Sequence, residues 1–87
     1  ANILSAQGEL AEAMRLLKMK EEICRRLNNW QGLAISFANQ AAILAQQGDR
    51  TGALALARQA FGMAESHSYI PLARQIQQMI QKLGQGA

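Results

Sequence analysis

The chain repeats itself at a step of 40 residues. Residues 4–14 read LSAQGELAEAM, and residues 44–54 read LAQQGDRTGAL. Sliding residues 1–24 onto residues 41–64 gives seven identical pairs, whereas a composition so rich in Ala, Leu and Gln gives about two or three by chance. A period of this length built from two helices is typical of a helical solenoid, in which each unit packs on its neighbours. The repeat therefore restricts the possible folds more than any single motif does.

The segments between the repeated turns have the residues and the periodicity of α-helices. The 87 residues are 49% hydrophobic but only 5% aromatic, and Val, which favours strands, does not occur. Apolar residues at helical spacing predict the end of one helix, stopped by Gly8, and four further helices. These four cover residues 9–27, 30–47, 50–66 and 68–83. Because all the predicted elements are helices, the fold class is all-α. The turns between them have two to four residues, and such short turns force neighbouring helices to run antiparallel.

Three residues mark helix starts. Asn29 and Asp49 directly precede predicted helices and carry the short oxygen-bearing side chains that cap helix N-termini. Pro71, the only proline, is tolerated in the first turn of the last helix. A backbone N–H at that position has no acceptor within the helix, so the N–H that proline lacks is not missed.

Residues 28–61 resemble a tetratricopeptide repeat; they read NNWQGLAISFANQAAILAQQGDRTGALALARQAF. The resemblance is to the longer, roughly 40-residue kind found in kinesin light chains and cell-polarity scaffold proteins. The matching positions are Asn39, Ala41, Gly48-Asp49, Ala53 and Ala60. Gln40 departs from the pattern, because Leu is usual there.

The resemblance implies a right-handed α-solenoid of antiparallel helix hairpins. In this interpretation residues 1–28 are the end of one repeat, residues 29–67 are a complete repeat, and residues 68–87 are a C-terminal capping helix. We expect the whole segment, residues 1–87, to be part of a longer repeat array. Ala41, Ala53 and Ala60 are expected where two helices cross closely, since little more than a methyl group fits there.

In solenoids of this family the first helices of successive repeats line a concave groove that holds a peptide or a partner helix. The resemblance implies a groove face formed, in the complete repeat, by Ile35, Ala38, Asn39, Ala42 and Gln46. It continues through Asn2 on one side and through Arg74, Gln77, Gln78 and Gln81 on the other. Asn39 matches the peptide-contacting Asn of the family. Amides both donate and accept, so they can pair with the backbone of an extended peptide whatever its side chains.

The resemblance therefore implies a protein–protein interaction module with a scaffold or adaptor role. Two alternatives stay open. The chain can self-associate through exposed helix faces, its ends stacking to extend the solenoid. It can also be the peptide-sensing regulatory domain of a larger protein.

Other classes of function have little support in the residues. The net charge is +3, but the cations between residues 9 and 26 are interspersed with carboxylates, which favours a solvated helix face with i,i+4 ion pairs over a nucleic-acid surface. No apolar run approaches the length of a membrane span, and one cysteine fits a reducing compartment, so we expect a cytoplasmic protein. His67 stands alone, Cys24 matches Ala64 as a small apolar residue, and Trp30 and Tyr69 at equivalent helix starts are expected to pack between repeats. We predict no enzyme activity, no metal and no cofactor.

Overall fold

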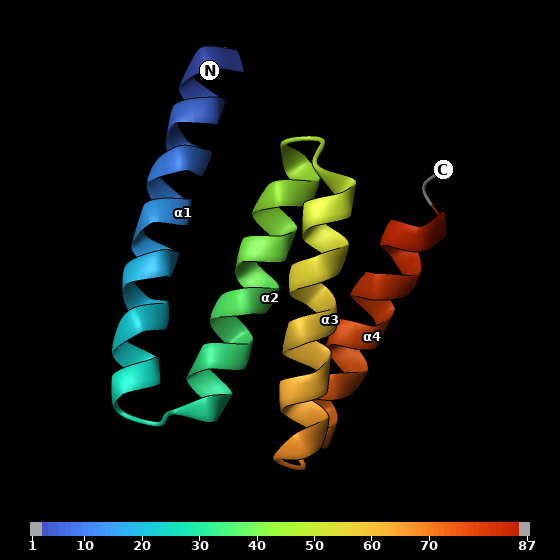
Figure 1. Cartoon of the computed structure of the whole chain (residues 1–87). Helices are drawn as coiled ribbons and strands as arrows, with labels where there is room; N and C mark the ends of the chain where they lie inside the picture. The colour runs from blue at the N-terminus through green and yellow to red at the C-terminus, as the bar shows by residue number, and fades with distance from the viewer. Residues whose placement is uncertain (1–2, 86–87) are drawn as a thin grey trace.

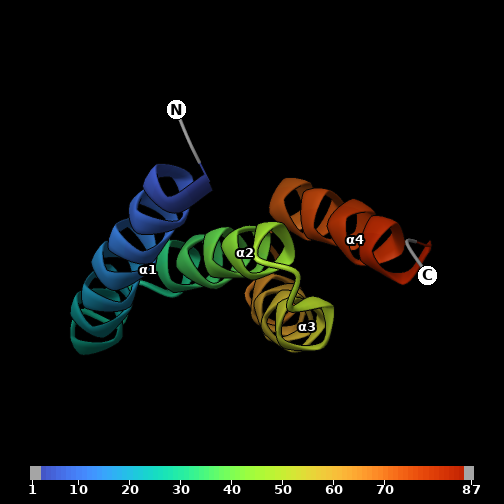
Figure 2. The same cartoon turned by 90° about the horizontal axis from the view of Figure 1, so that it is seen from above.

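A computed structural model describes residues 3–85 as four helices: α1 (Ile3–Arg26), α2 (Trp30–Gln46), α3 (Arg50–Ser66) and α4 (Ile70–Gln85). Consecutive helices run antiparallel and follow one another in chain order (Figure 1). Seen from above, α2 lies between α1 and α3, and α4 packs on α3 while also approaching α2 (Figure 2). The predicted all-α fold of antiparallel hairpins is confirmed, and its right-handed winding stays a prediction.

The three turns share one construction, repeated every 20 residues. Each has one residue in the left-handed region, with φ of 56° at Asn28, 89° at Gly48 and 61° at Ser68. The N–H of the following residue donates back to the carbonyl five residues earlier, at 2.8 Å in each turn. This hydrogen bond closes the end of one helix and reverses the chain.

The predicted N-caps are confirmed in two of these turns. The side chain of Asn29 accepts from the Gly32 N–H at 3.0 Å, and that of Asp49 accepts from the Gly52 N–H at 2.9 Å. Each bond satisfies a backbone donor that has no partner within the helix. After the third turn, α4 begins with Pro71 in its first turn, as predicted.

The predicted helix end at Gly8 is wrong. α1 runs without interruption through Gly8, which has no positive φ. Gly48 ends a helix and Gly8 does not, and the residue that follows each glycine explains why. Asp49 caps the next helix, whereas Glu9 is not among the residues preferred at an N-cap. A glycine inside a helix costs about 1 kcal/mol relative to Ala, which the continued hydrogen bonding of α1 offsets.

Alanines form the centre of the molecule. α3 lies between α2 and α4, and the residues along its buried side have no solvent exposure: Ala53, Ala57, Ala60 and Ala64. Ala41 of α2 is equally buried. Small side chains let the helix backbones approach closely, so the predicted burial of Ala41, Ala53 and Ala60 is confirmed.

An aromatic stack closes the end of the bundle near the first and third turns. The ring of His67 lies 5.4 Å from that of Trp30 and 5.9 Å from that of Tyr69, with interplanar angles of 11° and 22°. Offset stacking at this spacing adds to the stabilisation from burial alone. The sequence indicated packing for Trp30 and Tyr69, and the structure adds His67 between them.

Candidate interaction groove

Two adjoining hollows lie between α2 and α4, the helices that begin the two successive hairpins. The first, of about 280 Å³, is lined by Ile35, Ala38, Asn39, Leu72, Gln75, Ile76 and Met79. The second, of about 380 Å³, is lined by Ala42, Ala45, Gln75, Gln78, Met79, Lys82 and Leu83. Gln75 and Met79 line both hollows, so the two form one surface groove. We call this surface the α2–α4 groove.

The α2–α4 groove has an apolar floor and a polar rim. Ile76 is buried and Met79 is half-buried, while the amides of Asn39, Gln75 and Gln78 are exposed. This combination suits a polypeptide, because the floor takes apolar side chains and the amides can both donate to and accept from a backbone.

One end of the groove is basic. A hollow of about 350 Å³ continues it beyond Ala45 and Leu83 and is lined also by Gly48, Arg50 and Lys82. No acidic residue lines this part of the described surface, and neither cation takes part in an ion pair within residues 8–84. The end beside Arg50 and Lys82 therefore favours a negatively charged group.

The structure brings together five of the ten residues that the resemblance implied for the groove. Ile35 and Asn39 line the first hollow, and Ala42 and Gln78 line the second. Gln46 and Arg74 are exposed on α2 and α4 but line neither hollow.

The remaining groove predictions divide in the same way. Ala38 lines the first hollow, whereas Gln77 and Gln81 are exposed outside both. Asn2 lies outside the described residues. Sequence reasoning missed Gln75, Met79 and Lys82.

The difference on α4 between the expected residues and those that line the hollows has a geometric cause. A helix in the middle of a solenoid has one flank toward the preceding hairpin and one toward the following hairpin. On α2 the groove residues Ile35, Ala38 and Ala42 lie on the flank toward α4. Their counterparts 39 residues later are Arg74, Gln77 and Gln81, which lie on the far flank of α4. The flank of α4 that faces α2 carries Gln75, Gln78, Met79 and Lys82.

The interface of α1 with α2 is polar at its centre. The hydroxyl of Ser36 donates to the carbonyl of Leu17 at 2.9 Å, and the amide of Gln40 donates to the carboxylate of Glu21 at 2.8 Å. Gln40 is only 3% exposed, yet no buried side-chain polar atom in the described residues lacks a partner. Gln40, where the family usually has Leu, is thus matched by an acceptor on the neighbouring helix.

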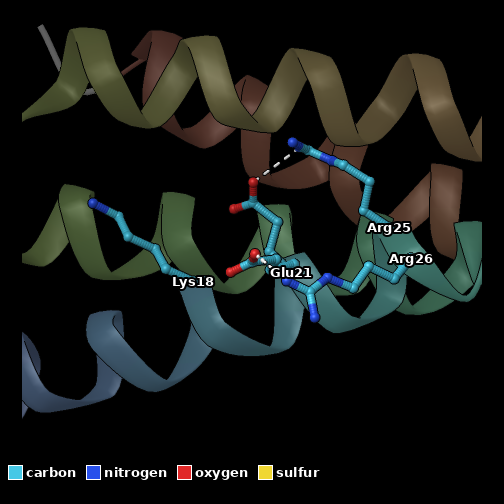
Figure 3. A pocket seen from close by; sticks show the side chains of 5 residues that line it. Lys18, Glu21, Arg25 and Arg26 are labelled. Atoms are coloured by element: carbon cyan, nitrogen blue, oxygen red, sulfur yellow. Dashed lines mark hydrogen bonds and ion pairs between the residues drawn. The ribbon is translucent and has the colours of Figure 1, made fainter.

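The side of α1 that borders its contact with α2 carries charged side chains, most of which pair within the helix. A hollow along it is lined by Lys18, Glu21, Glu22, Arg25 and Arg26 (Figure 3). As expected for i,i+4 ion pairs in this segment, Glu21 binds Arg25 at 3.0 Å and Glu22 binds Arg26 at 2.9 Å, while Lys18 forms no ion pair within residues 8–84. The carboxylates here face guanidinium groups of their own helix, so this hollow offers no paired-carboxylate site for acid–base chemistry.

A third ion pair, Glu12–Arg15, lies nearer the N-terminal end of α1. Glu12 accepts hydrogen bonds from the guanidinium of Arg15, and these bonds together with the positive charge hold the pKa of the Glu12 carboxyl below its ordinary value. Both side chains are exposed, so this is a surface pair.

Within residues 3–85 no helix combines the length and the apolar composition needed to cross a bilayer. The same residues contain no group of three His, Cys, Asp or Glu side chains placed to hold a metal ion.

Comparison with known proteins identifies the repeat. The family model of the tetratricopeptide repeat matches residues 33–68, which cover most of α2, the turn at Gly48 and all of α3. No curated protein and no solved structure gives a significant match. Repeats of this family generally act as protein–protein interaction modules and are generally not enzymes. Residues 33–68 of this chain are a tetratricopeptide repeat.

Proposed function

We propose that the α2–α4 groove binds an extended peptide segment of a partner protein, and that the chain serves as a scaffold or adaptor. The observation that carries the proposal is the continuous groove with an apolar floor, three exposed amides and a basic end. In this proposal binding involves no chemical turnover and no cofactor. It takes place in the cytoplasm, with the units 1–28, 29–67 and 68–87 forming part of a longer array.

The character of the groove suggests the peptide's chemistry. An extended segment projects alternate side chains to opposite sides, so every second side chain can enter the floor between Ile35 and Met79. The amides of Asn39 and Gln78, on facing helices, are available to the peptide backbone. Arg50 and Lys82 favour an acidic group at one end of the bound segment.

A peptide-display selection against the 87-residue chain tests the proposal. We expect selected sequences to combine spaced apolar residues with an acidic residue at one end, and we expect Asn39→Ala and Gln78→Ala to weaken their binding. Loss of a hydrogen bond worth about 0.5–1.5 kcal/mol corresponds to roughly a two- to tenfold rise in Kd. Calorimetric titration with the selected peptides measures this change.

The matched controls are Gln77→Ala and Gln81→Ala. Both remove an exposed amide from α4 outside the groove, so binding should be unchanged. Equal losses for groove and control variants, or peptides whose binding is unaffected by Asn39→Ala and Gln78→Ala, would place the binding surface elsewhere.

A further inference from the structure

A separate hollow, of about 580 Å³, lies between α1 and α3 and shares no residue with the α2–α4 groove. α1 and α3 lie on either side of α2 and, within residues 3–85, do not pack on each other (Figure 2). Trp30 and Phe37 of α2 form the floor between them, with Trp30 half-buried and Phe37 buried. We call this surface the α1–α3 hollow.

The α1–α3 hollow stays open in a longer array. Its lining residue on α1 is Arg25, two residues after Ile23. Residues two apart lie about 200° apart around a helix, so Arg25 and Ile23 are on nearly opposite sides of α1. Ile23 and Leu16 belong to the exposed apolar side of α1, which is where a preceding repeat would pack. Such a repeat would leave the Arg25 side uncovered.

The α3 wall of the hollow is open at a glycine that the fold does not require. α3 contains Gly52 and Gly62. A Cβ on Gly52 would collide with the capping carboxylate of Asp49, whereas a Cβ on Gly62 would meet no atom within 4 Å. Gly62 also has no positive φ, and glycine inside a helix is less favourable than alanine. Neither backbone nor packing therefore calls for Gly62, which leaves space between Arg58 and Ser66, one turn to either side.

The charge that lines the hollow is positive. Arg25 and Arg58 contribute guanidinium groups, and none of the Asp and Glu residues within 3–85 lines the hollow. Arg25 binds Glu21 of its own helix, so its charge is compensated. Arg58 is exposed and forms no ion pair within residues 8–84. Its guanidinium is available to a carboxylate from outside the chain, which it can bind through two parallel hydrogen bonds.

The apolar part of the hollow suits an aromatic ring. The Trp30 ring is stacked on that of His67, 5.4 Å away, and His67 also lines the hollow. Met63 of α3 is half-buried on the facing wall, and methionine sulfur makes favourable contacts with aromatic rings. Because this stack orders the floor in advance, a ring that packs on it has little ordering cost beyond its own.

We propose that the α1–α3 hollow binds an aromatic side chain of a partner protein, next to an acidic residue whose carboxylate accepts from Arg58. The ring fills the space that Gly62 leaves open and packs on Trp30 and Met63. Charge complementarity selects the acidic neighbour, because the free guanidinium has no carboxylate within the hollow. The site is independent of the proposed peptide binding, so the chain can hold one partner segment on each of two faces.

A peptide-display selection against a chain with a weakened α2–α4 groove tests the proposal. The target carries Asn39→Ala and Gln78→Ala, and peptides that also bind its Gly62→Leu derivative are removed. We expect the remaining peptides to share an aromatic residue next to Asp or Glu. Trp30 is the only tryptophan, so its single indole N–H signal in the NMR spectrum should shift as these peptides bind.

Two substitutions in the hollow measure the two contacts by calorimetric titration. Gly62→Leu should raise the peptide Kd roughly tenfold or more, because the leucine occupies the space of the ring. Its melting temperature should not fall, since leucine is the better helix former and meets no atom there. Arg58→Gln should raise the Kd roughly three- to tenfold through loss of a charge-assisted hydrogen bond.

The matched controls are Gly8→Leu and Arg74→Gln, which make the same substitutions on α1 and α4 outside the hollow and should leave the Kd unchanged. Three results would each overturn the proposal. The first is a selection in which no peptide distinguishes the target from its Gly62→Leu derivative. The others are peptides that bind equally well after Arg58→Gln and binding that leaves the Trp30 signal unmoved.

Discussion

Helices α1 and α3 occupy equivalent places in the sequence repeat and have different surroundings. α3 packs on both α2 and α4 and completely buries Ala53, Ala57, Ala60 and Ala64, whereas α1 packs, among the described helices, on α2 alone. At the positions equivalent to Ala53, Ala57 and Ala60, α1 has a half-buried Ala13, a half-buried Leu17 and an exposed Lys20. The number of neighbouring helices, and not the repeat position alone, sets the burial of each side chain.

The ion pairs also differ between α1 and α3. All three ion pairs within residues 8–84 lie on α1, where Glu12, Glu21 and Glu22 each bind an Arg one turn later. The counterparts of these glutamates on α3 are Gly52, Phe61 and Gly62. A helix flanked on both sides is held by packing, while one with a single neighbour relies more on its own i,i+3 and i,i+4 pairs.

The largest expected contrast comes from enlarging equivalent alanines. Ala53→Leu inserts three carbon atoms at a site with no exposure between packed helices, so we expect a loss of about 1–3 kcal/mol in the free energy of unfolding. Ala13→Leu, at the counterpart on α1, is half-buried and should cost well under half as much. Urea denaturation followed by circular dichroism measures both. Equal losses would mean that both alanines lie in equally tight contacts.

A smaller effect is expected from the polar contact between α1 and α2. Gln40→Met removes the donor to Glu21 and should cost about 1–2 kcal/mol, since a partly buried carboxylate loses a hydrogen bond. At the equivalent places between α3 and α4 the residues are Phe61 and Met79, both partly buried against the core.

The double variant Glu21→Phe, Gln40→Met imports the apolar residues of the second interface into the first. It should recover at least half of the single variant's loss, because a pair of apolar side chains leaves no polar group unsatisfied. The comparison uses the same urea denaturation. A double variant less stable than Gln40→Met would show that the α1–α2 interface is not shaped like the α3–α4 interface.

The sequence predicted those features that depend on local chemistry. Asn29 and Asp49 cap helices because an oxygen at that position satisfies a free N–H, whatever the rest of the molecule does. Gly8 was misinterpreted because a glycine alone permits a turn without requiring one. Gln75 and Met79 were missed because the groove flank of α4 depends on which neighbour the helix has. Such information is contained in the tertiary arrangement and not in the periodicity of one helix.

The smallest expected effect concerns the Glu12–Arg15 ion pair of α1, whose two positions are occupied by Gly52 and Ala55 on α3. Arg15 lowers the pKa of Glu12 by hydrogen bonding first and by its charge second, so Arg15→Gln should return that pKa toward its ordinary value. An NMR titration of the Glu12 carboxyl carbon measures the change.

The sign of the linked stability effect follows from the lowered pKa. The pair's contribution is present above the ordinary pKa of a glutamate and is lost as the pH falls through the pKa of Glu12 in the folded chain. Wild type and Arg15→Gln should therefore differ slightly in stability at neutral pH and converge in acid. High salt should shrink the neutral-pH difference, since both side chains are exposed to solvent. An identical Glu12 pKa in the two proteins would mean that this ion pair does not persist in solution and contributes nothing to the stability of α1.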